Sequence, residues 1–112
     1  MSQTLESEIS GEELKALRDN ATPHRLIDCR EQDEWHICRI EGAQLIPLSN
    51  FAEDAPKRLG DKAAHLIVYC HHGVRSMRAT QWLRQHGYLA TQSLRGGIDL
   101  WSEEIDPSVP RY

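Results

Sequence analysis

Apolar positions in the middle of the chain form a short unbroken run, followed by a segment with helical spacing. The run is Leu66-Ile67-Val68-Tyr69, and its branched, continuous character is typical of a strand buried on both faces of a parallel sheet. Further on, Ala79, Trp82 and Leu83 recur at i, i+3 and i+4, which predicts a helix. Gly87 is the residue type usually found just past a helix C-terminus. The centre of the chain is therefore predicted to be a strand, a tight loop and a helix.

Strands and helices also alternate in the rest of the chain. Near its start, Ser10 and Glu13 have the spacing of a capping box. Ile9 and Leu14 have that of a hydrophobic staple, so a first helix is expected to run to about Asn20. Further elements are expected as strands at His24–Cys29 and Gln44–Leu48, helices at Glu31–Cys38 and Asn50–Leu59, a short helix bearing Ile98, Leu100 and Trp101, and an extended tail from Asp106. This alternation predicts an α/β fold with a doubly wound parallel sheet.

A cysteine stands where the central predicted strand ends. The loop that follows the strand is Cys70-His71-His72-Gly73-Val74-Arg75-Ser76. Such a loop points successive backbone N–H groups inward, and the helix behind it adds the positive end of its dipole. Near a helix N-terminus and a cation, the pKa of a cysteine falls from about 8.5 to between about 3.5 and 7.5. Because ligands of such sheets bind beyond the carboxyl ends of the strands, Cys70 is predicted to be a nucleophile.

The pattern Cys70-x-x-Gly73-x-Arg75-Ser76 resembles the active-site loop of single-domain rhodaneses, which carry sulfane sulfur as a cysteine persulfide. Two further stretches are similar to the first and last signatures of that family: Leu26-Ile27-Asp28-Cys29-Arg30 with Glu34-Trp35 and Gly42-Ala43 before Ile46-Pro47-Leu48, and Gly96-Gly97-Ile98-x-x-Trp101. The likeness spans roughly residues 5 to 105. It implies a single-domain rhodanese-like fold, with a central sheet of about five strands flanked by helices on both faces, and it supports a last strand at Thr91–Leu94.

The resemblance implies a thiosulfate sulfurtransferase. Cys70 would attack the outer sulfur of a donor such as thiosulfate, sulfite would leave, and a thiophilic acceptor would then take the sulfur from the persulfide. That acceptor would be cyanide in vitro and a thiol or protein in the cell. Backbone N–H groups from residues 71–76 would stabilise the negative charge of the persulfide. Because the sulfur is carried covalently on the cysteine, no cofactor is expected.

The remaining signature residues have several expected roles. His71 and His72 would line the mouth of the loop, with proton donation as an alternative. Arg75 would either contact the oxygens of the donor or pair with an acidic side chain and brace the loop. Structural support is expected from Asp28, Arg30, Gly96, Gly97 and Trp101, and Trp35 is expected to be a further core anchor.

Length and composition fit one such domain, comprising residues 1–112 with a core at about 5–105 and a tail at 106–112. The net charge of −4 argues against binding to nucleic acid or to anionic membranes. The sequence has no apolar stretch of membrane-spanning length, and its polar start, Met1 to Thr4, has no signal-peptide core. Three cysteines without a C-x-x-C pair suit a reducing cytoplasm. Of these, Cys29 and Cys38 are expected to be passive, with an exposed and oxidisable Cys38 as the alternative.

Other functions stay open at this point. A phosphatase or arsenate reductase would use a longer C-x5-R loop, whereas Cys70 and Arg75 enclose four residues. A non-catalytic rhodanese-like module usually lacks the cysteine. A metal site would have to draw on His36, Cys38, Cys70, His71 and His72, whose spacing is not that of closed zinc sites, so no metal is expected.

One stretch departs from the family pattern. Where rhodaneses usually have Gly-His-Ile-Pro-Gly-Ala, this chain has Cys38-Arg39-Ile40-Glu41-Gly42-Ala43. Local rearrangement of the turn is expected there, and Arg39 adds a charge to a potential partner surface.

Overall fold

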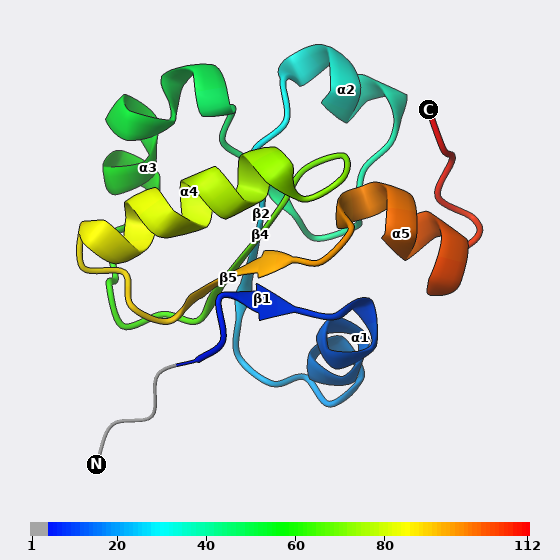
Figure 1. The fold of residues 1–112 in the computed structure, drawn as a ribbon, viewed down its shortest axis with the longest axis horizontal. Helices are drawn as coiled ribbons and strands as arrows, with labels where there is room; N and C mark the ends of the chain where they lie inside the picture. The colour runs from blue at the N-terminus through cyan, green and yellow to red at the C-terminus, as the bar shows by residue number, and fades with distance from the viewer. Residues whose placement is uncertain (1–4) are drawn as a thin grey trace.

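Five parallel strands form one sheet in the computed structural model, which describes residues 5–112 (Figure 1). The strands are β1 (Glu8–Ile9), β2 (Arg25–Asp28), β3 (Gln44–Leu45), β4 (Leu66–Tyr69) and β5 (Thr91–Leu94). Their order across the sheet is β1-β5-β4-β2-β3, so β4 lies at the centre. All four residues of β4 are fully buried, as its unbroken apolar run predicts. The predicted parallel α/β sheet is confirmed.

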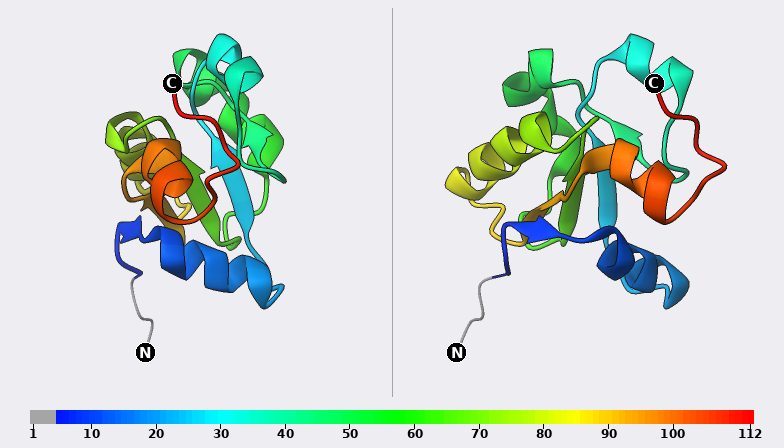
Figure 2. Two further views of the ribbon diagram at one scale, coloured as in Figure 1. Left: turned by 90° about the vertical axis from the view of Figure 1, so that its right-hand side faces the viewer. Right: turned by 45° about the vertical axis from the view of Figure 1, so that its right-hand side comes forward.

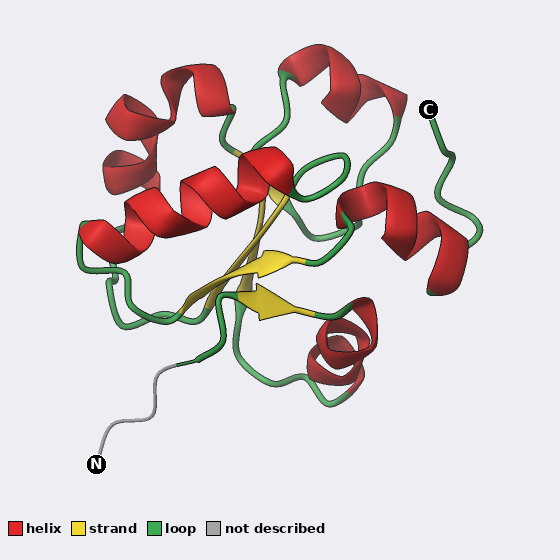
Figure 3. Cartoon of the chain, viewed as in Figure 1, coloured by secondary structure: helices red, strands yellow, loops and turns green. Residues whose placement is uncertain are grey.

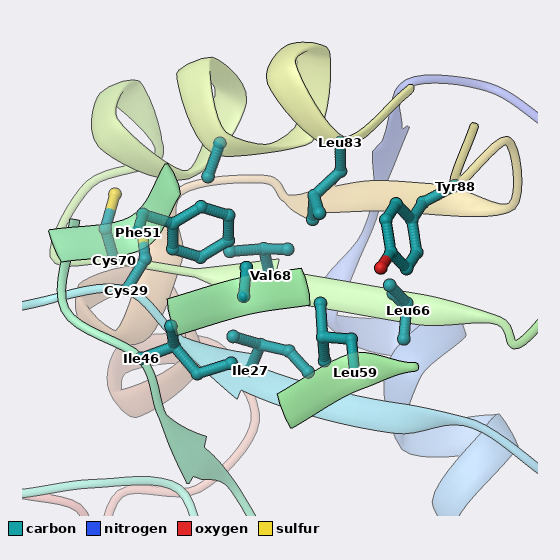
Figure 4. Packing of buried hydrophobic residues seen from close by; sticks show 12 residues of the cluster. Ile27, Cys29, Ile46, Phe51, Leu59, Leu66, Val68, Cys70, Leu83 and Tyr88 are labelled. Atoms are coloured by element: carbon teal, nitrogen blue, oxygen red, sulfur yellow. The ribbon is translucent and has the colours of Figure 1, made fainter. Parts of the chain in front are cut away.

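Helices cover both faces of this sheet (Figures 2 and 3). They are α1 (Gly11–Asp19), α2 (Gln32–Ile37), α3 (Phe51–Leu59), α4 (Val74–Gln85) and α5 (Gly97–Glu104), with the short 3-10 helix η1 (Leu48–Asn50) before α3. One core cluster joins α3 and α4 to the sheet, and a second joins α1 and α5 to the opposite face. Figure 4 shows the first cluster, in which Phe51 and Leu83 pack over Val68. The doubly wound arrangement is therefore also confirmed.

The start of α1 shows how local sequence sets an element. The Ser10 hydroxyl accepts a hydrogen bond from the Glu13 amide at 3.1 Å, and the Glu13 carboxylate accepts one from the Ser10 amide at 3.2 Å. These reciprocal bonds are the predicted capping box, and they satisfy two amides that would otherwise lack partners. None of the described helices is long and apolar enough to cross a membrane. The polar start, Met1–Thr4, lies outside the described residues.

Three features differ from the expectations. Strand β1 is an addition, because Ile9 was assigned only to the staple and instead also pairs in register with Leu94 of β5. Trp35 is not a core anchor: its side chain is partly exposed, and the Arg39 guanidinium lies 4.6 Å from the ring centroid. The alternative of an exposed Cys38 is wrong, because the residue is 8% exposed and packs in the α1/α5 cluster.

The chain after α5 turns back across the molecule. Val109 is buried in the α1/α5 cluster, and its carbonyl accepts a hydrogen bond from Ser102. The last residues then run toward α2 (Figure 2), where the Tyr112 hydroxyl donates to Glu34. The segment expected as an extended tail therefore reaches the neighbourhood of Cys70.

Candidate active site

The Cys70 sulfur lies against backbone amides at the carboxyl end of β4. Its Sγ accepts hydrogen bonds from the Gly73 amide at 3.1 Å and the Ser76 amide at 3.3 Å, and the Ser76 hydroxyl lies 3.4 Å away. The residue is only 1% exposed. Two of the amides expected from residues 71–76 thus contact the sulfur, and both stand at the start of α4, where the helix dipole also favours an anion. The arrangement suits a charged sulfur.

The carbonyl groups of the loop face the other way, toward α5, whose first turn lies beside the loop in Figure 1. The Ile98 amide donates to the Cys70 carbonyl at 2.9 Å, and the Asp99 amide donates to the His71 carbonyl at 3.1 Å. A Cβ atom at Gly97 would lie 2.5 Å from the Cys70 oxygen, so only glycine allows this approach. Gly96 and Gly97 therefore let α5 hold the carbonyls outward while the amides of the loop turn inward.

The pKa of Cys70 is lowered to about 5, which makes the thiolate the main form at neutral pH. The largest cause is the neighbouring Cys29 thiol; the Ser76 hydroxyl and the Ser76 and Gly73 amides add to it, whereas burial opposes it. The neighbouring Cys70 and burial raise the pKa of Cys29. Because two backbone amides contact Cys70 Sγ, the charge of the pair is assigned to Cys70.

Arg75 is held by an acidic partner. Its Nη1 donates to Glu34 Oε1 at 2.6 Å and its Nη2 to Glu34 Oε2 at 2.9 Å, which is a bidentate pair. The Arg75 hydrogen bonds are the largest cause that lowers the pKa of Glu34, to about 2. Of the two roles expected for Arg75, this geometry is that of bracing, because the pair ties the start of α4 to α2.

The two histidines lie at the outer side of the loop. The His71 ring stacks between His72, at a centroid distance of 3.9 Å, and Tyr112, at 4.0 Å. Its Nε2 is buried and has no hydrogen-bond partner among the described residues. Burial, followed by the neighbouring His72, lowers the pKa of His71, so the ring is neutral at pH 7. His72 and Val74 are mostly exposed, as expected for residues at a mouth.

Asp28 and Arg30 form a buried ion pair below the loop. Both side chains are 0% exposed, and Arg30 donates to the two Asp28 carboxylate oxygens at 3.0 Å and 2.7 Å. Arg30 also donates to the Cys38 carbonyl and to the Tyr112 hydroxyl. Trp101 is 5% exposed and packs in the α1/α5 cluster. These contacts are those of residues that support the loop rather than react.

The histidines also approach a carboxylate. Ligand atoms of His71, His72 and Asp99 all lie within 4.8 Å of one another, whereas His36 and Cys38 do not join this group. Asp99 is already bound by Arg111, whose Nε donates to it at 3.0 Å. A guanidinium on the carboxylate opposes a cation there. The group is therefore better described as an ion-paired rim of the loop.

Sequence reasoning missed three contributors to the site. Glu34 belongs to a signature, but no role was assigned to it, and Cys29 was expected to be passive. Tyr112 stood in the expected tail. The sequence signal for Glu34 is its charge, since the bracing role of Arg75 requires an acidic partner. No local pattern points to Tyr112.

A family model for the rhodanese-like domain matches residues 10–104 of the chain. The chain belongs to the rhodanese-like domain family. The match covers the sheet from β2 onward and every element that contacts Cys70, so the family resemblance noted in the sequence is confirmed.

Curated relatives of this rhodanese-like chain are longer proteins. It is 36% identical over 110 residues to adenylyltransferase and sulfurtransferase MOCS3-1 of Zea mays, covering 93% of this chain and 23% of the relative. It is 37% identical over 108 residues to the probable adenylyltransferase/sulfurtransferase MoeZ of Mycobacterium tuberculosis, covering 95% and 27%. The chain thus spans about a quarter of the length of these relatives.

Solved structures of similar size match nearly end to end. A rhodanese-related protein from Thermoplasma volcanium has a TM-score of 0.78 and 29% identity, covering 96% of this chain and 100% of that one. The human single-domain sulfurtransferase TSTD1 has a TM-score of 0.75 and 28% identity, covering 89% and 98%. The chain is therefore a rhodanese-like domain, homologous to domains of sulfurtransferases.

Proposed function

We propose that the chain is a sulfurtransferase that carries sulfane sulfur on Cys70 as a persulfide, with thiosulfate as donor. The observation that carries this proposal is the Cys70 sulfur itself, which has a lowered pKa and accepts two backbone hydrogen bonds at the end of the central strand. A preorganised amide stabilises developing negative charge by about 3 kcal/mol when it behaves like an oxyanion-hole donor. The named sulfurtransferases among its relatives support the same reaction class.

In the first step, the Cys70 thiolate attacks the outer sulfur of thiosulfate. The sulfur–sulfur bond of the donor breaks, and sulfite leaves with the bonding electron pair. The product is a Cys70 persulfide, whose terminal sulfur carries the negative charge. The Gly73 and Ser76 amides contact Cys70 Sγ, and the inward-facing amides of the same loop would stabilise the charge of the persulfide.

In the second step, an acceptor nucleophile attacks the terminal sulfur, and the Cys70 thiolate leaves. Cyanide accepts the sulfur in vitro, and a thiol or a protein accepts it in the cell. His71 and His72 would line the mouth of the loop, where the His72 side chain is mostly exposed and the His71 Nε2 is buried without a hydrogen-bond partner among the described residues. The charge of Arg75 is already neutralised by Glu34. A reducing compartment fits the reaction, since the Cys70 thiolate has to stay free.

The test is a thiosulfate and cyanide assay with thiocyanate as product. Wild-type protein should form thiocyanate with ping-pong kinetics, and Cys70→Ala should form none. Cys38→Ala is the matched control, because its thiol packs in the α1/α5 cluster, and it should retain activity. Mass spectrometry after thiosulfate treatment should show one added sulfur atom on the Cys70 peptide.

Three outcomes would reject the proposal. Thiocyanate formation that persists in Cys70→Ala would remove the persulfide mechanism. Wild-type protein that never gains a sulfur atom would instead indicate a binding module. Turnover of an aryl phosphate that exceeds sulfur transfer would favour a phosphatase, against the four-residue spacing between Cys70 and Arg75.

A further inference from the structure

A second cysteine lies beside Cys70 on the neighbouring strand. Strands β2 and β4 pair in parallel, with Asp28 beside Tyr69 as the last pair of the register. The Cys29 amide continues the ladder by donating to the Tyr69 carbonyl at 3.0 Å. One residue further along both strands, Cys29 therefore stands next to Cys70.

The two side chains also point to the same face of the sheet. Both belong to the cluster that α3 and α4 cover, and Figure 4 shows them together at one end of it. Neighbouring strands are about 4.8 Å apart, which lies within the Cα separation of about 4.4–6.8 Å that a disulfide needs. The third cysteine, Cys38, packs on the opposite face of the sheet. The strand register thus places two of the free cysteines, Cys29 and Cys70, at neighbouring strand ends and on the same face of the sheet.

We infer that Cys29 is a resolving cysteine, which attacks the Sγ atom of the Cys70 persulfide, releases hydrogen sulfide and leaves a Cys29–Cys70 disulfide. This inference rests on the proposed function, because the persulfide supplies the oxidising equivalent. It adds a sulfide-releasing activity to the transfer reaction. In the absence of an acceptor, the domain releases its bound sulfur as sulfide, and the disulfide then blocks the Cys70 thiol.

The step balances without an external oxidant. Cys29 loses its proton and forms a bond from its sulfur to Cys70 Sγ, while the bond from Sγ to the terminal sulfur breaks. The terminal sulfur leaves with the electron pair, takes the proton and becomes hydrosulfide. Sulfane sulfur is thus reduced to sulfide, and the two cysteine sulfurs are oxidised to a disulfide. A dithiol reductant returns the protein to its starting state.

The position of Cys29 gives its thiol access to Cys70 Sγ from inside the core. Gly73 and Ser76 hold the Cys70 sulfur from the loop, whereas Cys29 approaches it from the adjacent strand end, inside the core. Cys29 is 0% exposed, so molecules in solution do not reach its thiol. Because its proton is firmly held, the step is slow and an acceptor at the loop mouth takes the sulfur first.

The experiment is a single-turnover reaction with thiosulfate, without acceptor or reductant and without oxygen. Wild type is compared with Cys29→Val, Cys29→Ser and Cys38→Ala by intact mass, and sulfide is trapped with monobromobimane. Wild type and Cys38→Ala should first gain one sulfur atom, then lose it with release of one sulfide per protein. Peptide mapping should then show the Cys29–Cys70 disulfide. Both Cys29 variants should keep the added sulfur, with sulfide release slower by about tenfold or more.

The outcomes separate the two proposals. If wild type keeps its added sulfur as long as both Cys29 variants do, resolution by Cys29 is wrong while sulfur loading stands. If none of the four proteins gains a sulfur atom, the proposed function fails and the resolving step falls with it. Cys29→Ser guards against a packing or pKa effect of valine, because serine keeps a hydrogen-bond donor beside Cys70.

Discussion

Replacing Gly97 by alanine would place a methyl group against the backbone that shapes the loop around Cys70. The added Cβ would lie 2.5 Å from the Cys70 carbonyl oxygen and closer still to that of His71. These are the carbonyls that the Ile98 and Asp99 amides hold. Because backbone cannot give way as a flexible side chain does, α5 and the loop have to move apart.

The loss in free energy of unfolding that we expect from this substitution has three parts. Gly97 has φ +60°, and this left-handed conformation costs an L-residue about 1–2 kcal/mol. Overpacking adds about 1–3 kcal/mol. Weakening the two hydrogen bonds from α5 adds about 1 kcal/mol each. The total is about 5 kcal/mol, which lowers the melting temperature by about 20 °C in a domain of this size.

Gly60→Ala is the matched control. Gly60 has φ +59°, nearly the same φ, with ψ −76°, but nothing lies within 4 Å of its Cβ position. Its substitution should cost about 1–3 kcal/mol, from the unfavourable backbone conformation alone. Thermal unfolding measures both losses, and alkylation of Cys70 by iodoacetamide at about pH 6 should slow about tenfold in Gly97→Ala only. Equal losses of stability with unchanged alkylation in both variants would refute the idea that the close approach of α5 shapes the loop.

Three further predictions concern charges at the site. The alkylation rate of Cys70 should rise with pH through about 5, where its thiol loses the proton, and stay level above; a rise centred near pH 8.5 would mean an ordinary thiol. Asp28→Asn leaves the buried Arg30 charge without its partner and should destabilise the fold by about 3–5 kcal/mol in urea unfolding, whereas a loss below about 1 kcal/mol would contradict the buried ion pair. Arg75→Gln removes the fork that Glu34 holds, so kcat for thiocyanate formation should fall about tenfold with KM for thiosulfate nearly unchanged, and a large rise in KM would instead show that Arg75 contacts the donor.

The sequence predicted the centre of the fold because the signals there are local. The apolar run of β4 is buried on both faces, so its pattern needs no partner to be recognised. The same holds for the start of α4 and for the amides that follow Cys70, since a strand, a tight loop and a helix fix one another over a few residues. The placement of Cys70 at the strand end followed from this alone.

Features that depend on distant parts of the chain could not be predicted in this way. Strand β1 has two residues, one of them polar, and it exists only because β5 offers an edge more than eighty residues later. Tyr112 is separated from Glu34 by 78 residues, and no periodicity marks either of them. The environment of Cys29 depends on the register between β2 and β4, which cannot be predicted from the local sequence of either strand. These contacts come from tertiary packing rather than local propensity.

The hydrogen bonds from α5 to the Cys70 and His71 carbonyls have a consequence for how the protein is made. The helix that orients the nucleophile comes after it in the chain, and the strand before that helix, β5, has to insert between β1 and β4. A chain that ends after α4 therefore lacks the two hydrogen bonds that hold these carbonyls. We expect its Cys70 to be less reactive than that of the complete domain, because only β4 and α4 then shape the loop around the sulfur.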